Sequence, residues 1–115
     1  MYKYPKEEGD GLIAIDELKR INRLERIVIT EHARTRLFER GISVKDVINC
    51  INNGKIIEQY ENDKPFASCL VLGRAINEKY IHVVVSKDGD FIYLITAYYP
   101  NLEKFKSDLK TRKER

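Results

Sequence analysis

The stretch spanning residues 30–54 constrains the fold of this chain most, because its local signals agree on two helices joined by a tight corner. Thr30 has a side chain that caps the start of a helix, and Gly41 can adopt the left-handed conformation that ends one. Ser43 and Asp46 then form a weak capping box for a second helix, since aspartate is shorter than the preferred glutamate. We therefore predict one helix that ends just before Gly41 and another that follows directly.

The second of these helices carries a regular apolar stripe. The i, i+3, i+4, i+7 spacing of one helix face is occupied by Val44, Val47, Ile48 and Ile51. Ile42 precedes the cap and fits a hydrophobic staple with Val47. Asn53 and Gly54 close the helix, so we expect a short helix with one buried face.

After Gly54 the pattern changes to that of β-strands rich in β-branched and aromatic residues. Four such segments follow one another, at residues 55–61, 66–76, 80–86 and 91–99. The connections between them are short, which requires antiparallel neighbours, because a parallel pair needs a long crossover. The sequence thus predicts an α+β fold in which N-terminal helices pack on a four-stranded antiparallel sheet.

The last hairpin allows the two faces of this sheet to be predicted. Asp88-Gly89 favours a two-residue type I′ loop, which would place Lys87 opposite Asp90 and set the register. One face would then display Tyr80, His82, Val84, Tyr93, Ile95 and Tyr99. The other would display Ile81, Val83, Val85, Ile92, Leu94, Thr96 and Tyr98. The second set is more aliphatic and should pack on the helices, so the first set is the candidate working surface.

The two ends of the chain are less regular. Residues 1–11 combine proline, glycine and charge, as in a flexible lead-in, and a short helix is predicted from about Ile15 to Leu24. Residues 27–29 are a β-branched trio, which forms either a short strand or an extended entry into the helix pair. A basic C-terminal helix is predicted over residues 101–115.

Length and composition narrow the class of protein. The 115 residues form a single predicted domain, 1–115, large enough to bury about two-thirds of its unfolded surface. The 21 Lys and Arg against 18 Asp and Glu give a net charge of +3, which permits a nucleic-acid partner without requiring one. No apolar run approaches the roughly 18 residues of a membrane span and no signal peptide is recognisable, so we expect a cytoplasmic protein without a membrane partner.

Motifs for cofactors and metals are missing from the sequence. It contains no phosphate-binding G-x-x-x-x-G-K-[ST] loop, no dinucleotide fingerprint and no G-x-S-x-G elbow. Cys50 and Cys69 lack paired-ligand spacing and are predicted to be buried, reduced thiols. We therefore expect no metal bound by this chain and no small-molecule cofactor.

Two groups of residues remain that could carry chemistry. His32, Arg36 and Arg40 are spaced by four along one face of the first predicted helix, and the candidate working surface adds His82 among tyrosines. Aromatic rings stack on unpaired bases, arginines neutralise phosphate and histidine transfers protons near neutral pH. Together they suit metal-independent RNA cleavage. The alternative is that the arginines pair with Glu39 or with acids elsewhere and are merely solvated, and that His82 is a partly buried structural residue.

These residues also form a pattern that resembles a known family. The pattern HA-x-x-R-x-x-x-R-G-I begins at His32, and IHVVV at residues 81–85 and ITAYYP at residues 95–100 follow it. In these motifs the chain resembles a domain-of-unknown-function family within the RelE/ParE toxin superfamily, close to MqsR-like toxins. The similarity covers roughly residues 27–100, and its helical opening is the specific part.

The resemblance implies a RelE-like fold and a toxin-antitoxin setting. Toxins of this kind cleave mRNA, often on the ribosome, and a co-expressed antitoxin masks them. MqsR-like toxins commonly pair with an antitoxin that has a zinc-binding domain, so any zinc would belong to the partner. The residues that match recurrent positions of the family are His32, Arg36, Arg40, His82 and Tyr98, the last being the aromatic before the proline.

Our leading hypothesis is therefore a ribonuclease toxin with His82 as the proton-transfer residue. Arg36 and Arg40 would clamp phosphate, Tyr80 and Tyr93 would stack on bases, and Tyr98 would join the catalytic group. His32 would be a second proton carrier or a hydrogen bonder at the start of the helix.

Two alternatives stay open at this point. If the helix face and the His82 face lie on opposite sides of the sheet, the arginines become structural and bond to strand-end carbonyls or to acids such as Glu58 and Glu61. The chain could also be a non-catalytic protein-binding module of the same fold.

Overall fold

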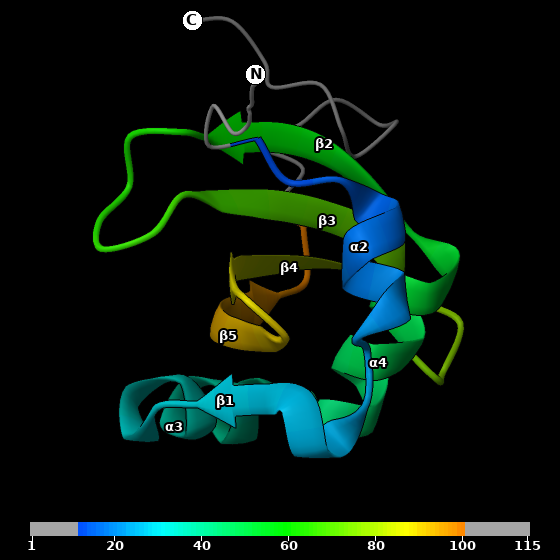
Figure 1. Cartoon of the computed structure of the whole chain (residues 1–115). Helices are drawn as coiled ribbons and strands as arrows, with labels where there is room; N and C mark the ends of the chain where they lie inside the picture. Colours follow the sequence, from blue (N-terminus) through cyan, green and yellow to red (C-terminus); the bar gives the residue numbers. More distant parts are fainter. Residues whose placement is uncertain (1–11, 101–115) are drawn as a thin grey trace, which may run out of the picture.

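The computed structural model describes residues 12–100 and has an α+β fold (Figure 1). The predicted lead-in at 1–11 and the predicted C-terminal helix at 101–115 lie outside the described residues. The helical elements are α2 (Ile15–Arg20), a 3-10 turn η1 (Leu24–Arg26), α3 (Glu31–Arg40) and α4 (Val44–Asn53). The strands are β1 (Ile27–Ile29), β2 (Lys55–Tyr60), β3 (Ser68–Arg74), β4 (Tyr80–Asp88) and β5 (Phe91–Tyr98).

The sheet is mixed and has five strands in the order β1-β5-β4-β3-β2. Strands β2 to β5 form the predicted antiparallel meander. The prediction of a four-stranded antiparallel sheet was wrong at its edge, because β1 adds a parallel strand beside β5, with Ile27 opposite Ile92 and Ile29 opposite Leu94. The β-branched residues 27–29 thus form a strand, and its partner β5 is the last strand of the described chain.

The helix pair was predicted correctly. The Thr30 hydroxyl oxygen accepts a hydrogen bond from the Ala33 N–H at 3.1 Å, and Gly41 ends α3 with a φ of 68°. Ser43 and Asp46 form both hydrogen bonds of a capping box at the start of α4. Helix α2 is shorter than predicted, because it ends at Arg20 and a separate 3-10 turn follows.

The predicted register of the last hairpin was wrong by two residues. The loop is Gly89-Asp90, so Asp88 lies opposite Phe91, and Gly89 has a φ of 61°. This is the position at which a type II′ turn needs glycine. An even shift leaves side chains on their predicted faces. Ile81, Val83, Val85, Ile92 and Leu94 accordingly belong to the core on the helix side.

A β-bulge in the same hairpin does change the faces. The register shifts between Val84 and Val85, so that Thr96 lies opposite Val84 and Tyr98 opposite His82. The extra residue on β5 is Ile95, and residues beyond it exchange sides. Tyr98 therefore does not pack on the helix side as predicted.

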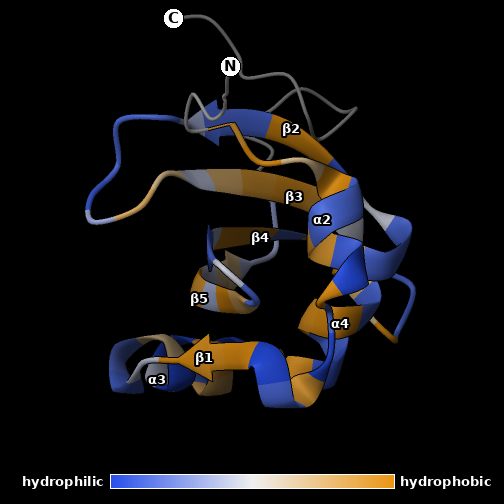
Figure 2. Ribbon diagram, viewed as in Figure 1, coloured by the Kyte–Doolittle hydropathy of each residue, from blue (hydrophilic) through white to orange (hydrophobic). Residues whose placement is uncertain are grey.

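One main core lies between the sheet and the helices. It joins Leu18 and Ile21 of the α2 region, Leu37 of α3, and Val47 and Ile51 of α4 to the inner face of the sheet. Figure 2 shows the matching hydropathy, with β1 and most of β3 coloured as hydrophobic. A smaller cluster on the opposite face of the sheet contains Leu70, Val84, Ile57, Tyr60 and Tyr98.

Helix α4 lies very close to β3. A Cβ atom on Gly73 would lie 2.8 Å from the Cys50 sulfur and closer still to the Cys50 carbonyl oxygen. A Cβ atom on Gly54 would lie 2.6 Å from the Leu72 carbonyl oxygen. Because interiors are close-packed, glycine at these two positions is what allows the helix to approach the strand.

Candidate functional site

Two open grooves lie on the described part of the molecule, one on each side of α3. The first, which we call the loop groove, has a volume of about 520 Å³ and lies between the start of α3, strand β5 and the loop from β2 to β3. The second, the helix groove, has a volume of about 420 Å³ and lies between α3 and α4. The loop groove carries the polar chemistry, and its relevant residues are His32, Asp63, Lys64, Phe66, Ser86 and Tyr93.

The two polar walls of the loop groove are held by local hydrogen bonds. His32 is the second residue of α3, and its side chain is exposed beside the Thr30 cap. Across the groove, the Asp63 N–H donates to the Tyr60 carbonyl oxygen at 3.3 Å, and the Ser68 hydroxyl donates to the Asp63 carboxylate at 2.5 Å. These bonds fix the loop that carries Lys64, whose peptide bond to the following proline is cis.

The floor of the loop groove combines aromatic rings with a hydroxyl group. The rings of Phe66 and Tyr93 are in contact, with centroids 6.0 Å apart and planes tilted by 37°. Ser86 lies directly opposite Tyr93 in the sheet and is only 5% exposed. Its hydroxyl makes no hydrogen bond with the residues at 12–100, so it can donate to a ligand in the groove.

This arrangement could support acid–base chemistry on a bound phosphodiester. A carboxylate and an imidazole in one groove supply a proton acceptor and a proton donor. A lysine supplies positive charge beside them, and the aromatic pair offers a surface on which an unpaired base can stack. Within residues 12–100 no group of three or more His, Cys, Asp or Glu side chains is placed to hold a metal ion.

Of the residues proposed from the sequence, the structure brings His32 and Tyr93 together in the loop groove. His82 is fully buried, and its ring meets that of Tyr98 edge-on at a centroid distance of 5.4 Å. The prediction that His82 is displayed on an open working surface was therefore wrong. Tyr98, which the β-bulge brings opposite His82 in the sheet, is one of the side chains that cover it.

The two arginines proposed as phosphate clamps have partners within the fold. Arg36 forms an ion pair with Glu39 at 3.6 Å. Arg40 donates to the Thr96 hydroxyl at 3.1 Å and to the Ala97 carbonyl oxygen at 2.9 Å, both on β5. Arg40 thus fits the structural alternative, bonding to a carbonyl near the end of a strand.

Tyr80 lies apart from both grooves. Tyr80 is 42% exposed, and its ring lies under the guanidinium group of Arg74, which is 5.3 Å from the ring centroid. The Tyr80 hydroxyl accepts a hydrogen bond from this guanidinium, an interaction that raises the pKa of Arg74. Tyr80 and Tyr93 therefore do not form one stacking platform.

Sequence reasoning missed four residues of the loop groove, namely Asp63, Lys64, Phe66 and Ser86. The first three belong to the segment that was interpreted only as a turn and the start of a strand. Polar groups on a turn carry no signal of what they face, because that depends on where the loop folds back. The pairing of Ser86 with Tyr93 depends on the register that was predicted two residues off.

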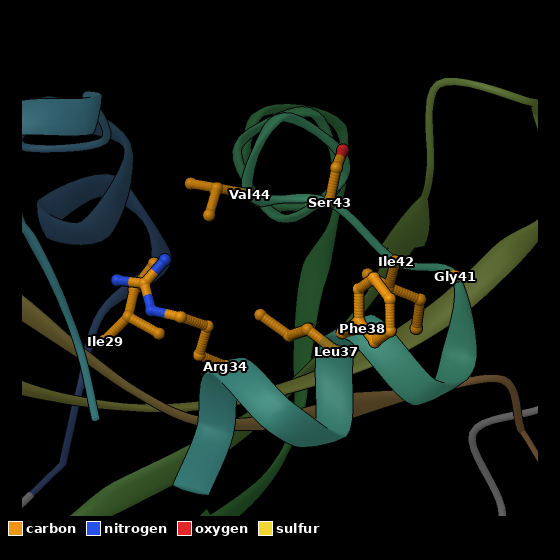
Figure 3. A pocket seen from close by; sticks show the side chains of 8 residues that line it. All are labelled: Ile29, Arg34, Leu37, Phe38, Gly41, Ile42, Ser43 and Val44. Carbon is orange, nitrogen blue, oxygen red and sulfur yellow. The ribbon is translucent and has the colours of Figure 1, made fainter. Parts of the chain in front are cut away.

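The helix groove is apolar. Figure 3 shows its side chains, with Leu37 between Arg34 and Phe38 on α3, and with Val44 of α4 and the N-cap residue Ser43 on the other side of the groove. Phe38 is 86% exposed although it is a large apolar residue.

The fold and the site together define a small α+β protein. Its described part has a five-stranded mixed sheet, three α-helices and two grooves flanking α3. The chain belongs to the family described as Domain of unknown function (DUF4258), whose model matches residues 29–99. No curated protein and no solved structure matches the chain. The matched range includes every residue that lines the two grooves. No helix within residues 12–100 is long and apolar enough to span a membrane.

Proposed function

We propose that this protein is a metal-independent endoribonuclease of the RelE/ParE type, a toxin whose mRNA substrate binds in the loop groove. The observation that carries the proposal is that His32, Asp63 and Lys64 line the same open groove as the Phe66–Tyr93 ring pair. The resemblance of the helical motif beginning at His32 to MqsR-like toxins supports the same class of activity.

The reaction follows from the groups in the groove. The Asp63 carboxylate takes the proton of a ribose 2′-hydroxyl, whose oxygen then attacks the adjacent phosphorus. The bond from phosphorus to the 5′-oxygen breaks, and protonated His32 gives its proton to that oxygen. The products are a 2′,3′-cyclic phosphate and a 5′-hydroxyl end. Lys64 stabilises the charge that develops on the phosphorane oxygens.

Substrate binding uses the floor of the groove. An unpaired base stacks on the Phe66–Tyr93 ring pair. Phe66 is 38% exposed and is therefore accessible to the base. The Ser86 hydroxyl donates a hydrogen bond to the bound nucleotide. Proton transfer is thus assigned to His32 instead of His82, which is fully buried.

The biological setting follows from the same resemblance. The toxin acts in the cytoplasm on mRNA, at the ribosome or free of it, and an antitoxin masks it until it is released. A zinc-binding domain, if the antitoxin has one, brings its own metal to the complex.

The test is to induce the full chain in a bacterial host, map new RNA 5′ ends and analyse their chemistry. Discrete 5′-hydroxyl ends should appear with wild-type protein. His32→Ala and Asp63→Asn should each reduce their yield by about 10²–10⁴-fold, the usual worth of a general acid or base. The side-chain amide in Asp63→Asn keeps an oxygen that accepts from the Ser68 hydroxyl, so the loop should stay in place.

Arg36→Ala is the matched control, because Arg36 is an exposed residue of the same helix with its partner on that helix. Cleavage should be unchanged in this variant. If His32→Ala cuts RNA as well as wild type while Arg36→Ala does not, the site assignment fails. If folded wild-type protein produces no new ends, the activity itself is refuted.

A second candidate function is a non-catalytic protein-binding module of the RelE-like fold. The observation that favours it is the helix groove with its exposed Phe38, which has no part in the RNA chemistry above. Loss of a partner interaction by Phe38→Ala, in a protein that leaves RNA intact, would support this second function.

A further inference from the structure

The helix groove has the shape of a docking surface. Its apolar wall comes from Ile29, Leu37, Ile42 and Val44, and its rim carries Arg34 and Phe38 (Figure 3). Arg34 and Phe38 are four residues apart and so lie on the same side of α3. Leu37 is only 4% exposed, so the groove floor is a fixed part of the core and not a mobile flap.

Phe38 is the most exposed large apolar side chain within residues 12–100. Its exposed fraction of 86% exceeds the 64% of Leu24 and the 56% of Ile76. Covering a phenylalanine ring that water now surrounds is among the larger gains that one side chain can make. A ring held at the rim of an apolar groove is placed to become the centre of an interface.

The charge beside the groove selects the kind of partner. Of the three arginines on α3, Arg36 is paired with Glu39, and Arg40 is bonded to β5. The Arg34 side chain has no ion pair or hydrogen bond in the described structure. The groove therefore offers one unneutralised cation next to apolar surface.

A helix suits this groove better than a strand. A strand added to the edge of β1 would gain few main-chain hydrogen bonds, because β1 has three residues. A helix that packs across α3 and α4 would instead place side chains at i, i+3 or i+4, and i+7 along the groove.

We propose that the helix groove binds an amphipathic helix of another protein, with apolar residues on Leu37 and Phe38 and an acidic side chain on Arg34. A second copy of this chain is a poorer occupant, because the same face would supply a second Arg34 instead of the acidic side chain that Arg34 favours. This interaction goes beyond RNA cleavage and holds whether or not the loop groove is a nuclease site.

The charge preference is tested with two labelled peptides in an anisotropy titration against the full chain. One is a helix-forming peptide with leucines at i, i+3 and i+7 and a glutamate at i+4; the other has lysine in place of that glutamate. We expect the acidic peptide to bind more tightly. Phe38→Ala should weaken it by about tenfold or more, and Arg34→Glu should reverse the preference between the two peptides. Binding of neither peptide, or equal binding of both, overturns the proposal.

The occupant is tested by placing a photo-crosslinking amino acid at position 38 of the full chain in the organism that encodes it. A cross-link to an acidic amphipathic helix of another protein, repeated with that helix as a synthetic peptide, supports the proposal. A cross-link to a second copy or to residues 101–115 of the same chain overturns it, and so does no cross-link.

The two proposals fail separately. Phe38→Ala and Arg34→Glu should leave RNA cleavage at the wild-type level, because neither residue lines the loop groove. A protein that binds the acidic peptide without cutting RNA would refute the nuclease while leaving the docking surface in place.

Discussion

Replacing Gly73 by alanine should destabilise the protein although it adds only a methyl group. Gly73 is a buried residue of β3, and the new Cβ atom would lie 2.8 Å from the Cys50 sulfur. It would lie closer still to the Cys50 carbonyl oxygen, which belongs to the backbone of α4. The sulfur could rotate away, but the oxygen cannot move unless the helix moves.

The expected cost follows from this geometry. Overpacking a close-packed core costs about 1–3 kcal/mol, and a backbone contact places Gly73→Ala in the upper half of that range, at about 2–3 kcal/mol. For a chain of 115 residues each kcal/mol lowers Tm by roughly 4 °C. Gly73→Ala should therefore melt roughly 8–12 °C below wild type, followed by circular dichroism and checked by urea denaturation.

Two further variants separate the contact from general effects of losing a glycine. Gly41→Ala introduces a Cβ atom with no other atom within 4 Å, so its cost of about 1–2 kcal/mol should come only from the left-handed backbone. Adding Cys50→Ala to Gly73→Ala removes the sulfur but leaves the carbonyl oxygen, so stability should not return. A Gly73→Ala protein as stable as wild type, or one restored by Cys50→Ala, would show that the backbone contact is not the cause.

Three other predictions follow from interactions described above. Burial raises the pKa of the Cys50 and Cys69 thiols from 9.0 to about 12, so each favours the neutral form in the folded protein. The two thiols therefore contribute their full stabilisation below about pH 9. Between pH 9 and 12 the free energy of unfolding falls by up to about 1.4 kcal/mol per pH unit for each thiol. Urea denaturation of a double alanine variant should give a flatter profile over this window. Arg40→Ala should lose about 1–2 kcal/mol of stability in the same assay, while cleavage per folded molecule is retained; the opposite pattern would make it a phosphate clamp. Asp46→Ala should lower the free energy of unfolding by about 2 kcal/mol and Ser43→Ala by about 1 kcal/mol, because the Asp46 carboxylate accepts two backbone hydrogen bonds and the Ser43 hydroxyl accepts one. Equal melting temperatures of the two variants would contradict this order.

The helix pair could be predicted because its determinants are local. A cap at Thr30, a left-handed glycine at Gly41 and a capping box at Ser43 each act within a few residues of the chain. Their effect on the backbone does not depend on the rest of the fold. The four antiparallel strands were predictable for the same reason, since short connections allow no other arrangement.

The sheet register could not be predicted in full because two local solutions compete. Asp88-Gly89 and Gly89-Asp90 can each form a two-residue loop, and only packing of the whole hairpin decides between them. The bulge at Ile95 leaves no mark in the alternation of a strand whose residues are nearly all apolar. It was this bulge that moved Tyr98 to the face of His82.

Of the residues that line the loop groove, sequence reasoning identified only two as site residues, and each of them stood out within its own segment. His32 stood out as a histidine at a helix start, and Tyr93 as an aromatic on the working surface. Their neighbours Asp63 and Lys64 come from a turn, whose placement is a tertiary property. The buried state of His82 is equally non-local, because its ring contact with Tyr98 depends on the register of two strands.

The parallel pairing of β1 with β5 bears on the order in which the protein can assemble. While the chain is being synthesised, β1 and α3 emerge long before the strand that they lie against. The meander of β2 to β5 can form from neighbouring hairpins, but β1 has no edge to join until β5 is complete. The start of α3, which carries His32, would then reach the loop groove in the last step, so a partly made chain would have no assembled loop groove.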